Sequence, residues 1–173
     1  EMYTDADGNK HYYTDQTDNY LQKNYQLLLN HSFSTAWNLN VALHYTKGDG
    51  YYEEYKPGSS LVEYGLKPFN PDGTETNESD LVRQKKMDNK FGGGVFSLNY
   101  TGNRLTASLG GGLNQYRGNN FGKVTWVKNY IGNLSPEHEY YRNKSKKTDG
   151  NIYLKANYDL TSTLSAYADL QYR

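Results

Sequence analysis

The side chains best suited to ligand binding are aromatic residues in two polar stretches of the chain. The candidates for direct contact are Tyr51, Tyr52, Tyr55, Trp126, Tyr140 and Tyr141. Exposed aromatic rings can stack on sugars or on organic chelators, whereas tyrosines in long loops also pack against their own loop. The sequence therefore predicts a ligand-binding role for these six residues, with packing inside the loops as the alternative.

Other residues that could carry chemistry lack the spacing that catalysis or metal binding requires. The chain has no cysteine, which excludes disulfides and thiolate metal sites, and its four histidines are not spaced as metal ligands. It contains no Gly-x-Ser-x-Gly sequence, acid–base dyad or nucleotide-binding signature. We therefore expect the protein not to be an enzyme and to need no cofactor or metal.

Two glycine triplets, at residues 92–94 and 110–112, resemble phosphate-binding loops only superficially. No Lys-Ser or Lys-Thr pair follows either triplet, and no helical pattern begins after them. Glycines that face each other across a hairpin instead leave a patch of sheet that bends easily or lies close to another backbone. We predict that the two triplets lie nearly opposite each other.

Alternation of apolar and polar residues defines the elements that must position the aromatic candidates. It is clearest in residues 148–173 and recurs in residues 25–45 and 96–113. The apolar positions of the clearest copy are Ile152, Leu154, Ala156 and Tyr158, then Leu164, Ala166, Ala168, Leu170 and Tyr172. A period of two indicates strands, and each run is about ten residues long, as a tilted strand needs to cross a bilayer.

These patterns predict an all-β fold, an antiparallel meander of about six long strands. Hairpins are expected at residues 20–46, 90–116 and 148–173, each with a short turn. In the third hairpin, the pairing places Tyr172 opposite Gly150. Residues 1–19 are expected to form a loop with a small hairpin, and residues 47–89 and 117–147 to form two long external loops.

Composition narrows the class of protein. The 19 basic and 19 acidic residues balance, which does not favour a nucleic-acid partner, and no apolar run is long enough for a membrane helix. Alternation alone does not separate a soluble β-sandwich from a membrane barrel. Three features favour the barrel: short turns alternate with long loops, the opposite face is polar, and aromatic residues lie at one end of their strands. These aromatic residues are Phe33, Tyr100 and Tyr158.

About six strands are too few to close a membrane barrel, which needs at least about eight. The chain begins at Glu1 without a recognisable signal peptide, and we expect it to be a piece of a larger barrel wall. Its apolar face and its edge strands would lack partners when isolated. We therefore predict that the fragment self-associates or curls to cover that face.

Residues 16–173 resemble the barrel region of TonB-dependent outer-membrane receptors, chiefly in residues 18–47, 81–100 and 118–173. The last stretch contains H-E-Y-Y-R-N-K-S-K-K-T-D-G-N-I-Y-L-K-A-N-Y. The resemblance implies a segment of a 22-stranded transmembrane barrel in the outer membrane of a Gram-negative cell, with an N-terminal plug. Such receptors import a scarce nutrient, namely a ferric siderophore, cobalamin, a glycan or a peptide, through contact with the TonB protein.

By this resemblance, the fragment supplies barrel wall and external loops, contacts outer-membrane lipid and a small nutrient ligand, and is not competent for transport alone. TonB would bind through an N-terminal region that this sequence lacks. Two alternatives stay open: a soluble β-sandwich module that binds carbohydrate, and a small complete outer-membrane barrel or adhesin.

Overall fold

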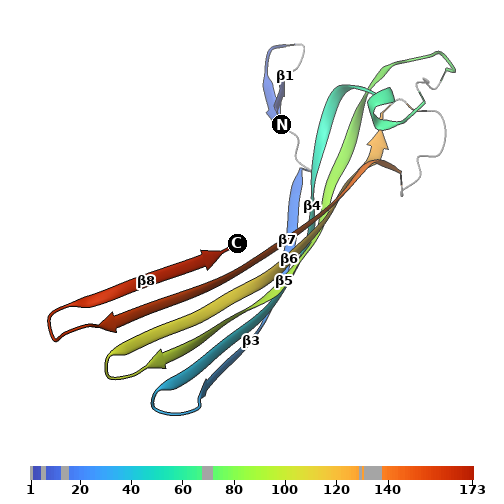
Figure 1. The fold of residues 1–173 in the computed structure, drawn as a ribbon. Helices are drawn as coiled ribbons and strands as arrows, with labels where there is room; N and C mark the ends of the chain where they lie inside the picture. The colour runs from blue at the N-terminus through green and yellow to red at the C-terminus, as the bar shows by residue number, and fades with distance from the viewer. Residues whose placement is uncertain (1, 5–6, 13–15, 68–71, 129, 131–137) are drawn as a thin grey trace. The chain divides into compact units, whose positions relative to one another are not determined.

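The fold is all-β. A computed structural model describes residues 2–4, 7–12, 16–67, 72–128, 130 and 138–173. Six strands form one antiparallel sheet in chain order (Figure 1). They are β3 (Thr17–Ser32), β4 (Trp37–Ser60), β5 (Glu78–Thr101), β6 (Leu105–Val127), β7 (Glu139–Asp159) and β8 (Ser165–Tyr172). The six-stranded antiparallel meander is therefore confirmed. No helix among the described residues has the length and hydropathy needed to cross a membrane.

A separate two-stranded hairpin pairs β1 (Met2–Thr4) with β2 (Lys10–Tyr12), as the Asp-Gly turn in residues 1–19 suggested. Residues 5, 6 and 13–15, which belong to the same expected region, lie outside the described residues.

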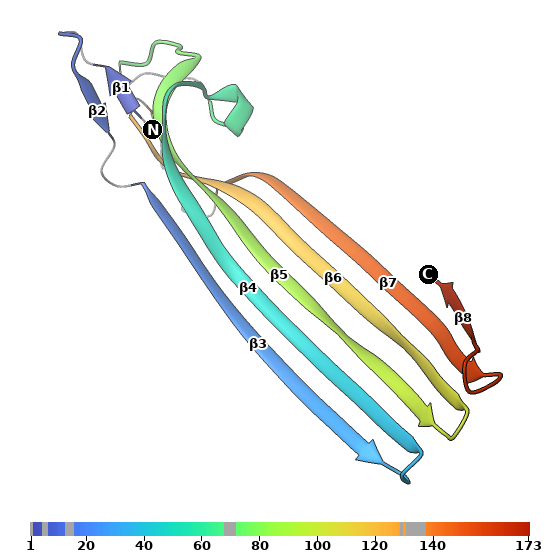
Figure 2. The same ribbon diagram turned by 90° about the vertical axis from the view of Figure 1, so that its left-hand side faces the viewer.

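Three short turns join β3 to β4, β5 to β6 and β7 to β8, and they lie at the same end of the sheet (Figure 2). Each turn is closed by backbone hydrogen bonds. The Phe33 amide donates to the Trp37 carbonyl at 3.0 Å, and the Gly102 amide donates to the Leu105 carbonyl at 2.8 Å. In the third turn the Thr161 hydroxyl also accepts from the Leu164 amide at 3.0 Å.

The expected long loops are shorter than the sequence suggested. β4 continues to Ser60 and β5 begins at Glu78, while β6 continues to Val127 and β7 begins at Glu139. The prediction that residues 47–89 form one long irregular loop is therefore wrong, and the external loop expected at residues 117–147 also contains strand at both of its ends. Polar and charged cross-strand pairs hold these extensions, for example Gln84 with Glu53 at 2.7 Å, and hydropathy does not register such pairs.

The chain forms two compact units. The turn-side unit comprises Lys23–Lys47, Lys90–Arg117 and Ser145–Arg173. The loop-side unit comprises Glu1–Gln22, Gly48–Asn89 and Gly118–Lys144.

In the turn-side unit, apolar residues of adjacent strands face one another. β7 pairs with β8 so that Ile152 lies opposite Tyr172 and Leu154 opposite Leu170. The intervening pairs are polar, such as Lys155 with Asp169, whose charged groups lie 3.7 Å apart. The two-faced pattern is confirmed for this hairpin. The prediction that Tyr172 faces Gly150 is wrong by two residues, because the turn spans Leu160–Leu164 and is held by Thr161.

The polar face of the turn-side unit carries a hydrogen-bonded network that crosses four strands. Asn30 donates to Asn40 at 2.7 Å, and Asn40 donates to the Ser97 hydroxyl at 3.3 Å. Asn99 also donates to Ser97, at 3.2 Å, and the Ser108 hydroxyl donates to Asn99 at 2.8 Å. Polar side chains thus satisfy one another on this face.

The apolar face of the same unit is exposed. Leu27 is 65% exposed, Leu113 64% and Leu170 68%. Apolar side chains at this density on one sheet face form a patch far larger than single surface hydrophobics do. This surface lacks an apolar cover within the described residues.

The prediction that the two glycine triplets lie nearly opposite each other is wrong. Gly93 lies against Asn114, so the triplets are offset along the strands and approach each other only at Gly94 and Gly112. A Cβ atom on Gly112 would lie 3.3 Å from the Gly94 carbonyl oxygen. On the polar face, the ring of Tyr153 lies across Gly110, where a Cβ atom would collide with the phenol. The glycine gap in one strand is therefore covered by an aromatic ring from the next.

Candidate ligand-binding site in the loop-side unit

A small core organises the loop-side unit. The 3-10 helix η1 (Val62–Tyr64) follows β4, and its neighbours pack into a cluster. The buried members are Leu61, Tyr64, Leu66, Leu81 and Val124. Gly65 ends η1 with a φ of 66°, a left-handed conformation that glycine adopts without strain, and its amide donates to the Val62 carbonyl at 2.9 Å.

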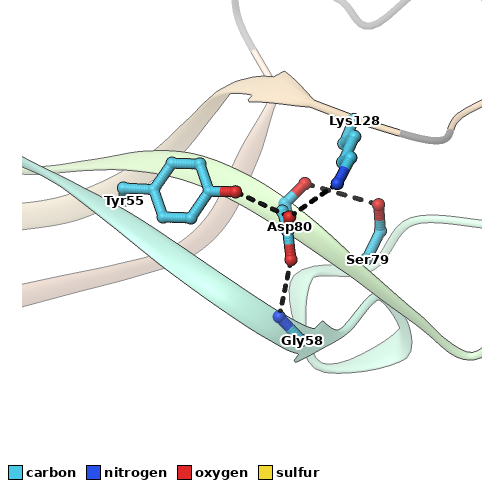
Figure 3. Close-up of polar contacts among 5 residues, drawn as sticks. All are labelled: Tyr55, Gly58, Ser79, Asp80 and Lys128. Carbon is cyan, nitrogen blue, oxygen red and sulfur yellow. Dashed lines mark hydrogen bonds and ion pairs between the residues drawn. The ribbon is translucent and has the colours of Figure 1, made fainter. Parts of the chain in front are cut away.

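Asp80 fastens three segments of this unit together (Figure 3). Its carboxylate accepts a hydrogen bond from the Tyr55 hydroxyl at 2.6 Å and from the Gly58 amide at 3.0 Å, and Lys128 Nζ lies 3.3 Å away. The Lys128 amide also donates to the Asp80 carbonyl oxygen at 2.9 Å. The hydrogen bond from Tyr55, assisted by Gly58 and Lys128, lowers the pKa of Asp80 although partial burial raises it.

The hydrogen bond from Tyr55 to Asp80 fixes one member of an aromatic pair. The rings of Tyr55 and Trp126 are stacked with their centroids 6.3 Å apart, and Trp126 is 44% exposed. Because its hydroxyl is fixed on Asp80, Tyr55 has little freedom to rotate. The pair therefore presents a pre-oriented aromatic surface with one accessible indole.

A second fixed group surrounds Arg83. Its guanidinium forms a salt bridge with Glu54 and donates a hydrogen bond to the Tyr64 hydroxyl at 2.9 Å. Partial burial raises the pKa of Glu54, but the hydrogen bond and the charge of Arg83 outweigh it, so the net pKa is lowered. His138, the residue before β7, donates from Nε2 to the Tyr64 carbonyl of η1 at 2.6 Å.

Tyr140 and Tyr141 lie together over β6. Their ring centroids are 4.9 Å apart, and Tyr140 also meets Tyr64 edge-on at 4.7 Å. A Cβ atom on Gly122 would collide with both rings, so glycine makes room for the pair. The Tyr140 hydroxyl is buried and has no hydrogen-bond partner within the described part of the chain, and burial raises the pKa of Tyr140 to about 12.

Tyr51 and Tyr52 each lie against a lysine. Lys86 Nζ is 5.0 Å from the Tyr51 ring centroid, and Lys85 Nζ is 5.7 Å from that of Tyr52. Consecutive residues of a strand point to opposite faces, so the two tyrosines do not act on the same ligand surface. Each ring carries a cation–π contact that offers positive charge beside an aromatic face.

The six candidates therefore form separate groups rather than one site. The structure brings together Tyr55 with Trp126 and Tyr140 with Tyr141, and it separates Tyr51 from Tyr52. Sequence reasoning missed Asp80 and Arg83, because neither belongs to a motif and both act through partners that lie far along the chain. Within the described ranges, no cluster of histidine and carboxylate side chains could hold a metal ion.

The Tyr55–Trp126 pair is the better candidate for ligand contact. It combines an exposed ring with a fixed orientation, whereas Tyr140 is packed against the core cluster. A flat, pre-oriented indole suits the faces of sugars and of aromatic or conjugated chelators. No family model, curated protein or solved structure matches the chain.

Proposed function

We propose that this chain is part of a TonB-dependent receptor in the outer membrane of a Gram-negative cell. The turn-side unit is a segment of the transmembrane barrel wall, and the loop-side unit contributes to capture of a scarce nutrient. The nutrient class is that expected from the resemblance: a siderophore, cobalamin, a glycan or a peptide. A plug and a TonB-binding segment belong to the rest of the receptor.

The observation that carries this proposal is the division of the sheet in the turn-side unit. One face is apolar and exposed, and the other is a network of asparagine and serine side chains. Lipid would cover the first face and water the second, as in the wall of a membrane barrel. From Tyr25 in β3 to Phe33 just after it, eight residues span about 27 Å along the strand, or about 20 Å along the membrane normal at a tilt of about 40°, which is somewhat less than the apolar height of about 25 Å of such a barrel.

The open edges of the sheet agree with a larger wall. β3 and β8 each have a single neighbour in the six-stranded sheet, so both edges can accept another strand. A soluble sandwich would cover the apolar face with a second sheet, and the described residues supply only the β1–β2 hairpin in addition. These features favour the wall over the carbohydrate-binding sandwich.

The receptor proposal is tested with the full-length polypeptide that contains this chain. It should carry a plug-sized domain before the barrel, and cells expressing it should take up one nutrient of the expected classes. Replacing Tyr55 and Trp126 with alanine should weaken ligand affinity about tenfold or more, since base–aromatic and similar stacking contributes about 1–3 kcal/mol per ring. The matched control replaces Tyr51 with alanine, which leaves the stacked pair intact.

A polypeptide without a plug would contradict the receptor proposal. Unchanged affinity in the double variant would instead remove only Tyr55 and Trp126 from the ligand site.

A further inference from the structure

The apolar face of the turn-side unit ends in a row of five basic residues. One row across this face contains Tyr25, Tyr45, Gly92, Gln115 and Thr148. Two residues farther along each strand, toward the long connections, the next row on the same face contains Lys23, Lys47, Lys90, Arg117 and Lys146. Successive same-face positions in a strand are two residues apart, so the five cations fall side by side on neighbouring strands.

Contacts in the tyrosine row fix the register that defines the basic row. Tyr25 and Tyr45 have ring centroids 6.3 Å apart, and a Cβ atom on Gly92 would lie 3.1 Å from the Tyr45 ring. Gln115 Nε2 lies 3.4 Å from the Thr148 hydroxyl. Between β5 and β6, a Cβ atom on Gly93 would lie 2.8 Å from Asn114 Cα, which aligns the neighbouring Gly92 with Gln115.

The same register holds six residues beyond the tyrosine row. Lys86 lies over the Tyr51 ring, and the Arg142 guanidinium lies 4.2 Å from the Phe121 ring centroid. The number of residues between the tyrosine row and these contacts is the same on each strand, so no strand carries an extra, bulged residue between them. The five basic residues lie between the tyrosine row and these contacts, so both sets of contacts fix their alignment.

The basic row is accessible and strongly charged. Lys23, Lys90, Arg117 and Lys146 are exposed, and none of the four has a salt bridge to a described residue; Arg117 donates to the neutral Gln115 side chain at 2.7 Å. Asp49 and Asp88 come one row farther on, together with Lys144, so the two rows keep a net positive charge. Like charges on directly opposed strand positions destabilise a sheet unless an anion lies between them.

We propose that this basic row binds the phosphate groups of anionic lipid headgroups at one boundary of the bilayer, an inference that rests on the proposed membrane function. The row adjoins the tyrosines, which are the residues that barrels place at the membrane–water interface. Long lysine and arginine side chains on an apolar surface extend their charges to the headgroup level. Phosphate oxygens would offset the repulsion within the row.

The charge is confined to one end of the apolar face. At the other end, the short turns formed by residues 34–36, 102–104 and 160–164 contain a single basic residue, Arg104. Lipids with zwitterionic or uncharged headgroups can therefore cover that end of the face. The face therefore distinguishes two leaflets, and only the leaflet at the basic row needs anionic lipid.

The test uses the full-length polypeptide that contains this chain, refolded into vesicles, with every tryptophan except Trp37 replaced by phenylalanine so that Trp37 is the only indole. Quenching of Trp37 by brominated phosphatidylcholine reports contact with the bilayer interior and so checks the wall assignment. Spin-labelled phosphatidylglycerol and phosphatidylcholine then report which lipid is immobilised at the protein surface. We expect the anionic lipid to be preferred, by roughly fivefold for each cation that contacts a phosphate.

Two double variants provide the comparison. Lys90→Gln with Lys146→Gln should lower the preference for phosphatidylglycerol by about 25-fold, since two contacts of about fivefold each are lost. Lys147→Gln with Lys155→Gln removes the same charge from the polar face of β7 and should leave the preference unchanged. Lys146 and Lys147 are adjacent in sequence but lie on opposite faces, which makes this control close.

The outcomes separate the two proposals. Absence of Trp37 quenching would contradict the wall assignment. Quenching with equal immobilisation of both lipids, or an equal loss in both double variants, would overturn the headgroup site alone. A preference abolished by millimolar inorganic phosphate at constant ionic strength would also overturn it, because the row would then bind free anions rather than lipid.

Discussion

Leucine side chains behave differently in the two units of this chain. In the turn-side unit, leucines such as Leu27 and Leu113 lie exposed on the sheet, whereas Leu61 and Leu81 of the loop-side unit are fully buried. The loop-side unit forms its own core from a short helix and a few strand residues. The turn-side unit has no such cover in the described residues, so its apolar face depends on its surroundings.

Polar residues show the same contrast. Neutral amides and hydroxyls form the network of the turn-side unit, from Asn30 to Ser108. In the loop-side unit, charged groups such as Asp80 and Arg83 make the main polar contacts. Under the proposed wall function, the first unit should therefore respond to the surrounding lipid and the second to pH.

The largest expected effect comes from placing a charge on the apolar face. Leu154→Lys puts an ammonium group near the middle of the apolar band and should destabilise the full-length polypeptide in vesicles by about 2–4 kcal/mol. Asn157→Lys, on the polar face of the same strand, should cost less than about 0.5 kcal/mol. Urea unfolding in vesicles, followed by tryptophan fluorescence, measures both. Equal costs would contradict a lipid-facing side.

The next effect separates two glycines of one triplet. A Cβ atom on Gly93 would collide with the backbone of Leu113 and Asn114, whereas one on Gly94 would meet the flexible end of Leu43. We expect Gly93→Ala to cost about 1–3 kcal/mol and Gly94→Ala distinctly less, because backbone yields less than a side-chain methyl group. The same unfolding assay ranks them, and the reverse order would show that the strands pair differently.

Acid should loosen the loop-side unit through Asp80. Its pKa is lowered in the folded chain, so its hydrogen bonds stabilise above the ordinary aspartate pKa of about 3.9 and are lost as pH falls through the lower folded value. Hydrogen exchange at the Gly58 amide, which donates to Asp80, should therefore lose protection below about pH 4.

Asp80→Asn is the matched variant for this transition. It should reduce protection of Gly58 at neutral pH and remove the further loss on acidification. Glu54 also has a lowered pKa, so a transition that persists unchanged in the variant would assign the acid response to Glu54 instead.

The smallest effect concerns the Tyr140 hydroxyl. Because this buried group has no partner in the described part of the chain, Tyr140→Phe should change stability by no more than about 0.5 kcal/mol or increase it slightly. Ultraviolet titration should lose one tyrosine that ionises near pH 12. A marked loss of stability would mean that the hydroxyl has a structural partner.

Local pattern predicted much of the turn-side unit. The alternation in residues 152–158 and 164–172 assigned the two faces of the last hairpin, because burial on one side imposes a period of two. The register was wrong by two residues, since it depends on how Thr161 closes the turn. Hydropathy also missed the strand extensions that polar pairs such as Glu54 with Arg83 hold.

The candidate site was harder to predict. Tyr140 and Tyr141 are consecutive residues of β7, which regular strand geometry places on opposite faces, so their ring contact did not follow from the local pattern. Tyr55 meets Trp126 because both flank β5, which depends on two registers that no local pattern sets. The contacts of Asp80 with Tyr55 and Lys128 likewise depend on how β4, β5 and β6 align, which no local pattern sets.

The most direct test of the two-faced wall is a spin-label scan along β7. Residues 1–173 contain no cysteine. Single cysteines at positions 152–158 of the full-length polypeptide in vesicles, with any cysteine outside these residues replaced by serine, can therefore be labelled and probed with oxygen and with a nickel chelate. We predict that positions 152, 154, 156 and 158 are accessible to oxygen and that positions 153, 155 and 157 are accessible to nickel. Equal accessibility at odd and even positions would contradict the account.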